Sequence, residues 1–386
     1  MTTTASQTLH WSGADTDLTV VERQISHLRK EISRRLDDAS PVVTHIFNLV
    51  VYTSSHEQAE QISLDLTSVS QQHPSRAIIV IADRWHEDSP IDAEVRLMCV
   101  PQRPGRPPLC YEQVFVTVQG RAADHLSSVV VPLLLPELPT YLWWPGQPPF
   151  GHRLFHRLLS ATDKLVVDSG QFASPGDGFN DLARLCSGRH GVNDIHWLRL
   201  RPWREIIAQF FDAPRLTPYA RGIYSVTIEF GSGEGNYALS TAGLLLMLGW
   251  VACELGMSPE TTLDVVATRD VALSLLHRNR LIPIDVNFRD HGSDAAGKLM
   301  MIELRSAIDN APEGIFEVER SADFRHAHVT MRIGDESEVS RVVSLETGTD
   351  LDLLAAELAA TGHDHLYERV VEMAARIAGR ELWVPD

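Results

Sequence analysis

The sequence lacks the short motifs that identify the common classes of enzyme. It contains no Gly-x-Ser-x-Gly nucleophile elbow and no His-Glu-x-x-His zinc motif. The glycine run Gly231–Gly235 has neither the Gly-x-Gly-x-x-Gly spacing of a dinucleotide site nor the lysine of a Walker loop. No two carboxylates stand out as an acid and base couple. We therefore predict no catalytic residue, no cofactor and no metal site.

Cysteine is also scarce, and no two cysteines have the Cys-x-x-Cys spacing. The four cysteines are Cys99, Cys110, Cys186 and Cys253. This usage predicts neither a disulfide framework nor a zinc site, and it favours a reducing compartment. The N-terminus has no basic segment followed by an apolar one, so we expect no signal peptide and a cytoplasmic protein.

Basic residues are outnumbered, because 34 Lys and Arg stand against 51 Asp and Glu and give a formal net charge of -17. A nucleic-acid partner would need a basic surface, so we expect none. The charge keeps copies of the chain apart, although self-association remains possible. The apolar stretch within 237–257 falls short of the roughly 20 residues that cross a bilayer. It therefore predicts a buried core helix and no membrane partner.

Residues 1–215 alternate helical and strand patterns, which is typical of an α/β domain with a doubly wound, mostly parallel sheet. The wholly apolar run Ala77–Ala82 indicates a strand buried on both faces. Residues before about Asp15 are polar, and we expect them to be frayed. Tyr141–Trp144 lies between prolines, which predicts a short edge-like strand. Further helices are expected at 18–36, 55–70, 122–135, 152–160 and 178–187, and further strands at 42–52, 93–100, 111–118 and 164–168.

Residues 216–386 change in pattern and predict an α+β domain. Helices are expected at 237–257 and 263–276. Strand-like runs separated by turn-forming residues follow, and this arrangement predicts an antiparallel sheet. The expected strands are 222–230, 282–288, 298–304, 314–320, 326–333 and 341–345, with two later helices at 350–360 and 365–376.

The stretch Asp194–Asp212, DIHWLRLRPWREIIAQFFD, is the part of the sequence built most like a site. Alternation over 196–201 predicts a short strand, and Pro202 suits the first position of a helix. An apolar helical face follows at Trp203, Ile206, Ile207 and Phe210. Three arginines gather where strand and helix meet, and a helix start attracts anions through its free N–H groups. These arginines are Arg199, Arg201 and Arg204.

Two interpretations remain open for the arginines and tryptophans. The arginines either contact a partner protein or pair with the chain's own abundant carboxylates. Trp143, Trp144 and Trp203 are either partner anchors, since Trp and Arg dominate interface hot spots, or core residues.

Two weaker candidates involve glycine and histidine. Gly231, Gly233 and Gly235, with Arg201, could hold an anion, although such a glycine run is more often a flexible turn. The pairs His326 with His328 and His363 with His365 would need a third ligand to bind a metal. We interpret these histidines as surface residues.

Three segments together resemble the glucose-6-phosphate dehydrogenase assembly protein family, known as OpcA. They are LPTYLWWPGQPP (138–149), KLVVDSG (164–170) and the stretch 194–212. The order of these segments agrees with the family, as do the upstream strand THIFNLVVY and the strand-rich C-terminal part. The resemblance covers nearly the whole chain.

The resemblance implies a non-enzymatic protein that binds glucose-6-phosphate dehydrogenase in the oxidative pentose phosphate pathway. It implies that the chain promotes assembly or the active state of that enzyme, and it carries over no catalytic residues. In cyanobacterial members of the family, the partnership is controlled by thiols of cysteines near the C-terminus. This sequence has no cysteine after Cys253. We predict partner contacts, or residues that support them, at Trp143, Trp144, Arg199, Arg201, Trp203 and Arg204. The alternative is a sugar-phosphate sensor or degenerate enzyme that uses Gly231–Gly235 and the Arg201 helix start.

Overall fold

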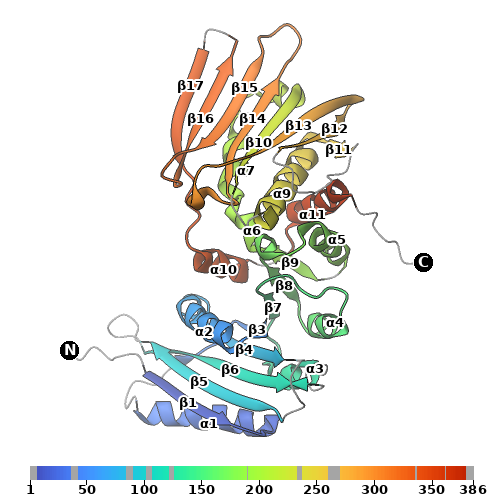
Figure 1. Cartoon of the computed structure of the whole chain (residues 1–386). Helices are drawn as coiled ribbons and strands as arrows, with labels where there is room; N and C mark the ends of the chain where they lie inside the picture. The colour runs from blue at the N-terminus through green and yellow to red at the C-terminus, as the bar shows by residue number, and fades with distance from the viewer. Residues whose placement is uncertain are drawn as a thin grey trace, which may run out of the picture. The chain divides into compact units, whose positions relative to one another are not determined.

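The computed structural model forms two compact units, each built around its own sheet (Figure 1). Unit 1 comprises Met1–Val167 and Thr349–Gly362, and unit 2 comprises Asp168–Gly348 and His363–Asp386. The predicted domain division at 215 and 216 stays a prediction, because contacts group residues by packing and need not follow domain boundaries. The structure describes residues 7–35, 42–83, 90–100, 107–120, 126–188, 190–232, 237–259, 270–334, 337–360 and 362–379.

The sheet of unit 1 is mostly parallel, as predicted. Its strands lie in the order β1-β5-β6-β4-β3-β7-β8, with β2 against β6. The pairs β1–β5 and β5–β6 are antiparallel, and the other pairs are parallel. The strands are β1 (Gln7–Gly13), β2 (Val42–Val43), β3 (Phe47–Thr53), β4 (Ser75–Asp83), β5 (Asp92–Val100), β6 (Leu109–Gln119), β7 (Thr140–Trp144) and β8 (Lys164–Val167).

Helices cover both faces of this sheet, with α1 on one side and α2 on the other (Figure 1). Helix α1 lies within the helix predicted over 18–36 and buries an apolar stripe of Val21, Ile25, Leu28 and Ile32. Helix α2 starts after Ser55, whose side chain accepts the N–H of Gln58. The helices of unit 1 are α1 (Leu18–Arg35), α2 (His56–Ser70), α3 (Leu126–Val130), α4 (Arg153–Leu159) and α10 (Asp350–Ala359), with a 3₁₀ turn η2 (Val131–Leu133).

Two expectations for unit 1 are wrong. Residues 7–13 of the polar segment before Asp15 are not frayed, because they form β1 and pair with β5, whereas residues 1–6 lie outside the described residues. Strand β7 is not an edge strand. It pairs with both β3 and β8, and all five of its residues are buried. The flanking prolines limit its length without excluding partners on its two sides.

The antiparallel sheet of unit 2 is confirmed, in the order β11-β12-β13-β10-β14-β15-β16-β17. One pair, β10–β13, is parallel. Residues 270–276 belong to a strand and not to the predicted helix 263–276, whose first part lies outside the described residues. The strands are β10 (Ile223–Gly231), β11 (Ser258–Pro259), β12 (Asp270–His277), β13 (Arg280–Arg289), β14 (Leu299–Ser306), β15 (Gly314–Arg320), β16 (His326–Ile333) and β17 (Ser337–Ser344).

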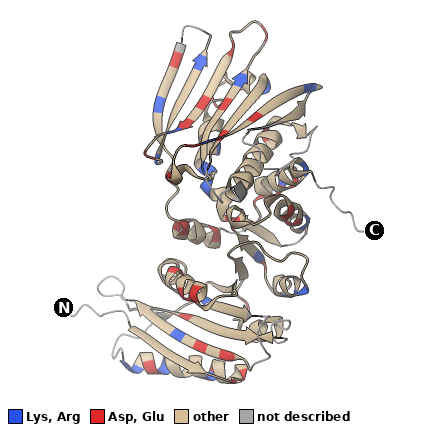
Figure 2. Ribbon diagram, viewed as in Figure 1, with Lys and Arg blue, Asp and Glu red and all other residues tan. Residues whose placement is uncertain are grey.

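Helix α9 is the core helix of unit 2. It packs against α11 and α5, and Figure 2 shows it almost free of charged residues. No helix among the described residues has the length and apolarity needed to cross a membrane. The remaining elements of unit 2 are β9 (Gly191–Asp194), η3 (Ser169–Gln171), α5 (Pro175–Cys186), α6 (Ile195–Arg199), α7 (Arg201–Gln209), α8 (Thr217–Arg221), α9 (Tyr237–Leu255), η4 (Ser293–Ala295) and α11 (His365–Ala378).

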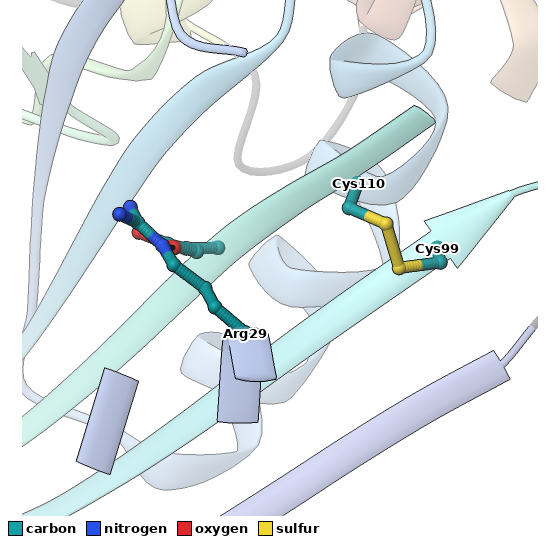
Figure 3. Close-up of a disulfide and its surroundings, with 4 residues drawn as sticks. Arg29, Cys99 and Cys110 are labelled. Atoms are coloured by element: carbon teal, nitrogen blue, oxygen red, sulfur yellow. Dashed lines mark hydrogen bonds and ion pairs between the residues drawn. A yellow bond between two sulfur atoms is a disulfide. The ribbon is translucent and has the colours of Figure 1, made fainter. Parts of the chain in front are cut away.

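A disulfide joins Cys99 and Cys110, although the cysteine usage predicted no disulfide framework. The two residues lie directly opposite each other on β5 and β6, with Cα atoms 4.1 Å apart (Figure 3). On the neighbouring stretch of β6, the buried Glu112 accepts a hydrogen bond from Arg29 Nε of α1 at 2.5 Å. The sequence spacing of the cysteines did not indicate the pairing, because strand register alone brings them together.

We predict that reducing this disulfide destabilises unit 1. A closed loop of this size restricts the unfolded chain enough to stabilise the fold by about 3 kcal/mol. A thermal melt with and without reductant should show the loss, with free thiols counted in parallel. The shift should persist in a Cys186→Ser, Cys253→Ser control and vanish in Cys99→Ser, Cys110→Ser. An unchanged melting temperature after complete reduction would contradict the prediction that the disulfide stabilises unit 1.

Candidate functional site

The stretch 194–212 folds as two consecutive helices, so the predicted strand over 196–201 is wrong. Asp194 caps α6, and its Oδ1 accepts the N–H of His196 at 2.9 Å. Helix α7 follows, with Pro202 in its first turn as predicted. The alternation was too short to distinguish a strand from a helical turn, and the capping carboxylate decides for the helix.

Arg199 forms a two-pronged ion pair with Asp168. Its Nη1 and Nη2 lie 2.8 Å and 2.7 Å from the two carboxylate oxygens. Asp168 also accepts the N–H of Gly170, which places it at the start of η3. Two of the segments that carry the family resemblance, 164–170 and 194–212, therefore meet through this pair. Such bidentate geometry is stronger and more specific than a single contact.

Asp194 is fully buried and joins three elements. Its Oδ1 accepts the N–H groups of Ser169 and His196, both at 2.9 Å, and its Oδ2 lies 3.1 Å from the hydroxyl of Tyr367. Burial, together with the charge of Asp168, raises the pKa of Asp194 to about 6. The carboxyl thus ties η3, α6 and α11 together in unit 2.

Arg204 stacks on Trp197, with the guanidinium carbon 3.1 Å from the ring centroid. Its Nη1 donates to the carbonyl of Trp197 at 2.6 Å. Burial lowers the pKa of Arg204 to about 9. On the other side, the Trp197 indole N–H donates to Asp364 at 3.0 Å. The cation–π contact fixes α6 against α7.

Trp203 lies in the core of unit 2, with 1% of its surface exposed. Arg320 of β15 lies 5.4 Å above its ring. Arg201 behaves differently, because its side chain is 64% exposed and pairs with Glu205 one turn later. Among the three predicted arginines, Arg201 is the one free to leave its ion pair at small cost, since exposed pairs of this kind contribute about 0–1 kcal/mol.

Trp143 and Trp144 lie in unit 1, whereas the arginines lie in unit 2. The tryptophans are 8% and 5% exposed. Trp144 stacks on Tyr52 with ring centroids 4.0 Å apart and meets Phe155 edge-on at 5.6 Å. Both side chains therefore act first as packing residues of their own unit.

Gly231, the first glycine of the predicted anion loop, has other partners. Its N–H donates to Lys298 O, and its carbonyl accepts the N–H of Gly297, both at 2.9 Å. A Cβ at this position would lie 2.1 Å from Ala295 O, so close packing requires glycine. Gly233 and Gly235 lie outside the described residues.

Three of the four histidines have carboxylate neighbours. His326 Nδ1 lies 2.6 Å from Asp323, and His363 and His365 lie 2.7 Å and 3.0 Å from Glu368. In the described part of the chain, no three His, Cys, Asp or Glu side chains are arranged to hold a metal ion.

Sequence reasoning missed the polar residues that organise this region. Asp168, Asp194, Asp364 and Tyr367 carry its main hydrogen bonds. Both Asp168 and Asp194 follow a strand and precede a helical turn, which is the usual place of a capping aspartate. That signal was present in the sequence and could have identified them.

The fold is that of a two-unit α/β protein. The polar cluster around Asp194 connects helical elements within unit 2. Family models for the glucose-6-phosphate dehydrogenase subunit N-terminal and C-terminal domains match 66–184 and 190–371. These matches cover most of the chain. The chain belongs to this glucose-6-phosphate dehydrogenase assembly family, also called OpcA.

Curated cyanobacterial relatives carry the name putative OxPP cycle protein OpcA. The Nostoc punctiforme protein is 30% identical over 315 residues, which are 80% of this chain and 66% of that protein. The Synechocystis protein is 32% identical over 193 residues, which are 50% of this chain and 39% of that protein. The chain thus spans less than two thirds of the length of these relatives.

The solved structures to which the chain is similar include oxidoreductases. One from Sinorhizobium meliloti is 12% identical, with a TM-score of 0.43 over 86% of this chain and 89% of that chain. One from Bacillus subtilis is 10% identical, with a TM-score of 0.46 over 86% of this chain and 96% of that chain. Similarity at this level carries no argument about the fold or the function of the chain.

We predict that Asp194→Asn changes how stability depends on pH. The folded pKa of about 6 lies above the ordinary 3.8, so the folded protein holds a proton that the unfolded chain has lost. This contribution is full below about pH 4 and is lost as the pH rises through 6, by about 3 kcal/mol. Asparagine keeps the Oδ1 acceptor and should abolish this loss.

The measurement is denaturant unfolding of both proteins from pH 4 to pH 7. The stability of the wild type minus that of Asp194→Asn should fall across this range and then level off. A difference that stays constant with pH would show that Asp194 titrates normally.

We predict that Trp203→Ala lowers stability by about 3–5 kcal/mol, because it empties a core position. Thermal melting should reveal the loss, while Arg201→Ala on the same helix should melt within error of wild type. If Trp203→Ala melted normally but lost partner binding, Trp203 would be a direct contact.

Proposed function

We propose that the chain is a non-enzymatic assembly factor and allosteric activator of glucose-6-phosphate dehydrogenase. It would bind the enzyme in the cytoplasm and promote the active oligomer or the high-affinity state, within the oxidative pentose phosphate pathway. The observation that carries the proposal is the match of both family domains, over 66–184 and 190–371. The relatives' names as OxPP cycle proteins support the same pathway.

The polar cluster of unit 2 supports a binding protein more than an enzyme. Its charged groups are committed to one another, since Arg199 pairs with Asp168 and Arg204 stacks on Trp197. Activation requires only that the chain bind one state of the dehydrogenase more tightly than the other. A tenfold difference in affinity between the states corresponds to about 1.4 kcal/mol.

The predicted contact residues would divide into two groups. Arg201 is exposed and is proposed to touch the partner directly. The others would support the contact by fixing the backbone, because they are mostly buried or ion-paired. This second group is Trp143, Trp144, Arg199, Trp203 and Arg204.

The sugar-phosphate alternative has weaker support. The Gly231 N–H already donates to Lys298 O, and the Gly231 carbonyl already accepts the N–H of Gly297. A thermal shift against glucose 6-phosphate tests this alternative directly. A ligand present at a hundred times its dissociation constant would add about 2.7 kcal/mol to stability.

We predict that titrating the dehydrogenase from the same organism with this chain lowers its apparent KM for glucose 6-phosphate. A complex should appear in parallel by mass measurement. Arg201→Ala should raise the dissociation constant of that complex more than fivefold, since a hot-spot arginine contributes over 1 kcal/mol. The matched control is Arg35→Ala, which removes another exposed arginine paired one helical turn away, with Glu31.

Three outcomes would separate the alternatives. A complex without a change in the rate of the dehydrogenase would support a purely structural role and would rule out activation. The absence of any complex would overturn the proposed partner. Equal effects of Arg201→Ala and Arg35→Ala would remove Arg201 from the contact while leaving the function intact.

A further inference from the structure

Strand β17 is an unprotected edge of the sheet in unit 2. All eight of its residues pair with β16 in continuous register, without a bulge, and it is the last strand in the sheet order (Figure 1). Glu338 to Val342 are all exposed. A long, regular edge offers unpaired backbone N–H and C=O groups to any other extended chain, and proteins ordinarily block such edges.

The strand at the opposite end of the sheet order, β11, is a poorer template for an added strand. Strand β11 is two residues long, and one of them is Pro259, which has no N–H to donate. Strand β17 has no proline and only two charged residues, Glu338 and Arg341. Its Val339 and Val342 are 55% and 59% exposed, although valine favours burial.

An apolar groove of about 400 Å³ runs beside this edge. Helix α7 packs on β15 and ends at Gln209, which is one of the residues that line the groove. The apolar lining residues are Phe210, Leu216, Val329, Met331 and Val339. Phe210, Leu216 and Val329 are buried, whereas Val339 stands open at the edge. The groove is therefore lined by buried residues of unit 2 at its base, and at the sheet edge it is exposed at Val339.

The charges on the rim indicate what kind of segment fits. Arg341 is already engaged, since its Nη2 donates to Gln209 Oε1 at 2.7 Å. Asp212 is exposed and has no ion-pair partner among the described residues. The chain as a whole carries a charge of -17. A basic residue on the incoming segment would meet both the free carboxylate and this overall charge.

We propose that an extended segment of the partner dehydrogenase adds to β17 as a further strand. It would place an apolar side chain in the groove and a basic side chain beside Asp212. Main-chain hydrogen bonds to the free edge supply affinity in this mode of recognition, and the pocket supplies specificity. The proposal rests on the proposed function, because the dehydrogenase is the occupant.

The chain offers a matched pair of variants for the test. Val339 lines the groove, whereas Val342 lies three residues along the strand and faces the other side of the sheet. Both are valines of similar exposure on one strand. Val339→Lys should weaken the complex with the dehydrogenase at least tenfold. Val342→Lys should change it less than threefold, and Asp212→Asn should weaken it severalfold.

Hydrogen exchange provides a second measurement that needs no variant. Adding the dehydrogenase to the wild-type chain should slow amide exchange over 337–344 and 209–216, because β17 gains main-chain hydrogen bonds. Unchanged exchange over both segments in a demonstrated complex would overturn the proposal. Equal binding by Val339→Lys and Val342→Lys would also overturn it.

The outcomes separate this inference from the function on which it rests. If the wild type forms no complex, the proposed function fails, and the docking site fails with it. If the wild type binds and Val339→Lys binds as well, only the docking site fails. If the chain alone forms dimers that Val339→Lys abolishes, the occupant of the edge is a second copy, and the proposal is wrong.

Discussion

The buried carboxyl of Asp194 is the constraint on which the rest of unit 2 depends. It receives the N–H groups of Ser169 and His196 and the hydroxyl of Tyr367, so three chain segments far apart in sequence converge on one side chain. Removing a partner from such a buried group leaves an unpaired polar atom, which costs about 1–3 kcal/mol. The position of α6, and with it the course of α7, follows from this convergence.

That constraint also decides which residues can meet a partner. Because α6 is fixed at Asp194, Arg199 reaches Asp168, and Arg204 returns to stack on Trp197. Both cations satisfy groups within their own unit and would lose those contacts by turning outward. Arg201 points away from this arrangement and keeps only an exposed pair with Glu205. The arginine cluster in the sequence is thus one exposed charge beside two structural ones.

The sequence predicted the elements whose periodicity is long and whose environment is simple. The apolar stripe of α1 and the wholly apolar run of β4 needed only a pattern to be recognised. Prediction from the sequence failed for short segments whose structure depends on contacts with residues far away in the chain. Six alternating residues at 196–201 resemble a strand, because the alternation by itself does not reveal that Asp194 caps a helix. Proline at both ends of β7 suggested an edge, although β3 and β8 lie on its two sides.

The polar cluster around Asp194 was not predicted, because its hydrogen bonds join residues far apart in the sequence. The disulfide was not predicted, because only the pairing register of β5 and β6 brings its two cysteines together. Nothing local to Cys99 or Cys110 indicates that they face each other across two antiparallel strands. The two end strands of the unit 2 sheet, β11 and β17, differ in what their local sequence explains. Pro259 explains locally why β11 is a poor template for another strand, whereas nothing within β17 limits pairing on its free side. The two edge strands therefore differ, since β11 is two residues long and contains a proline, whereas β17 is long, regular and beside a groove. That difference makes β17 the better template for an added strand, because its backbone N–H and C=O groups on the free side have no neighbouring strand among the described residues.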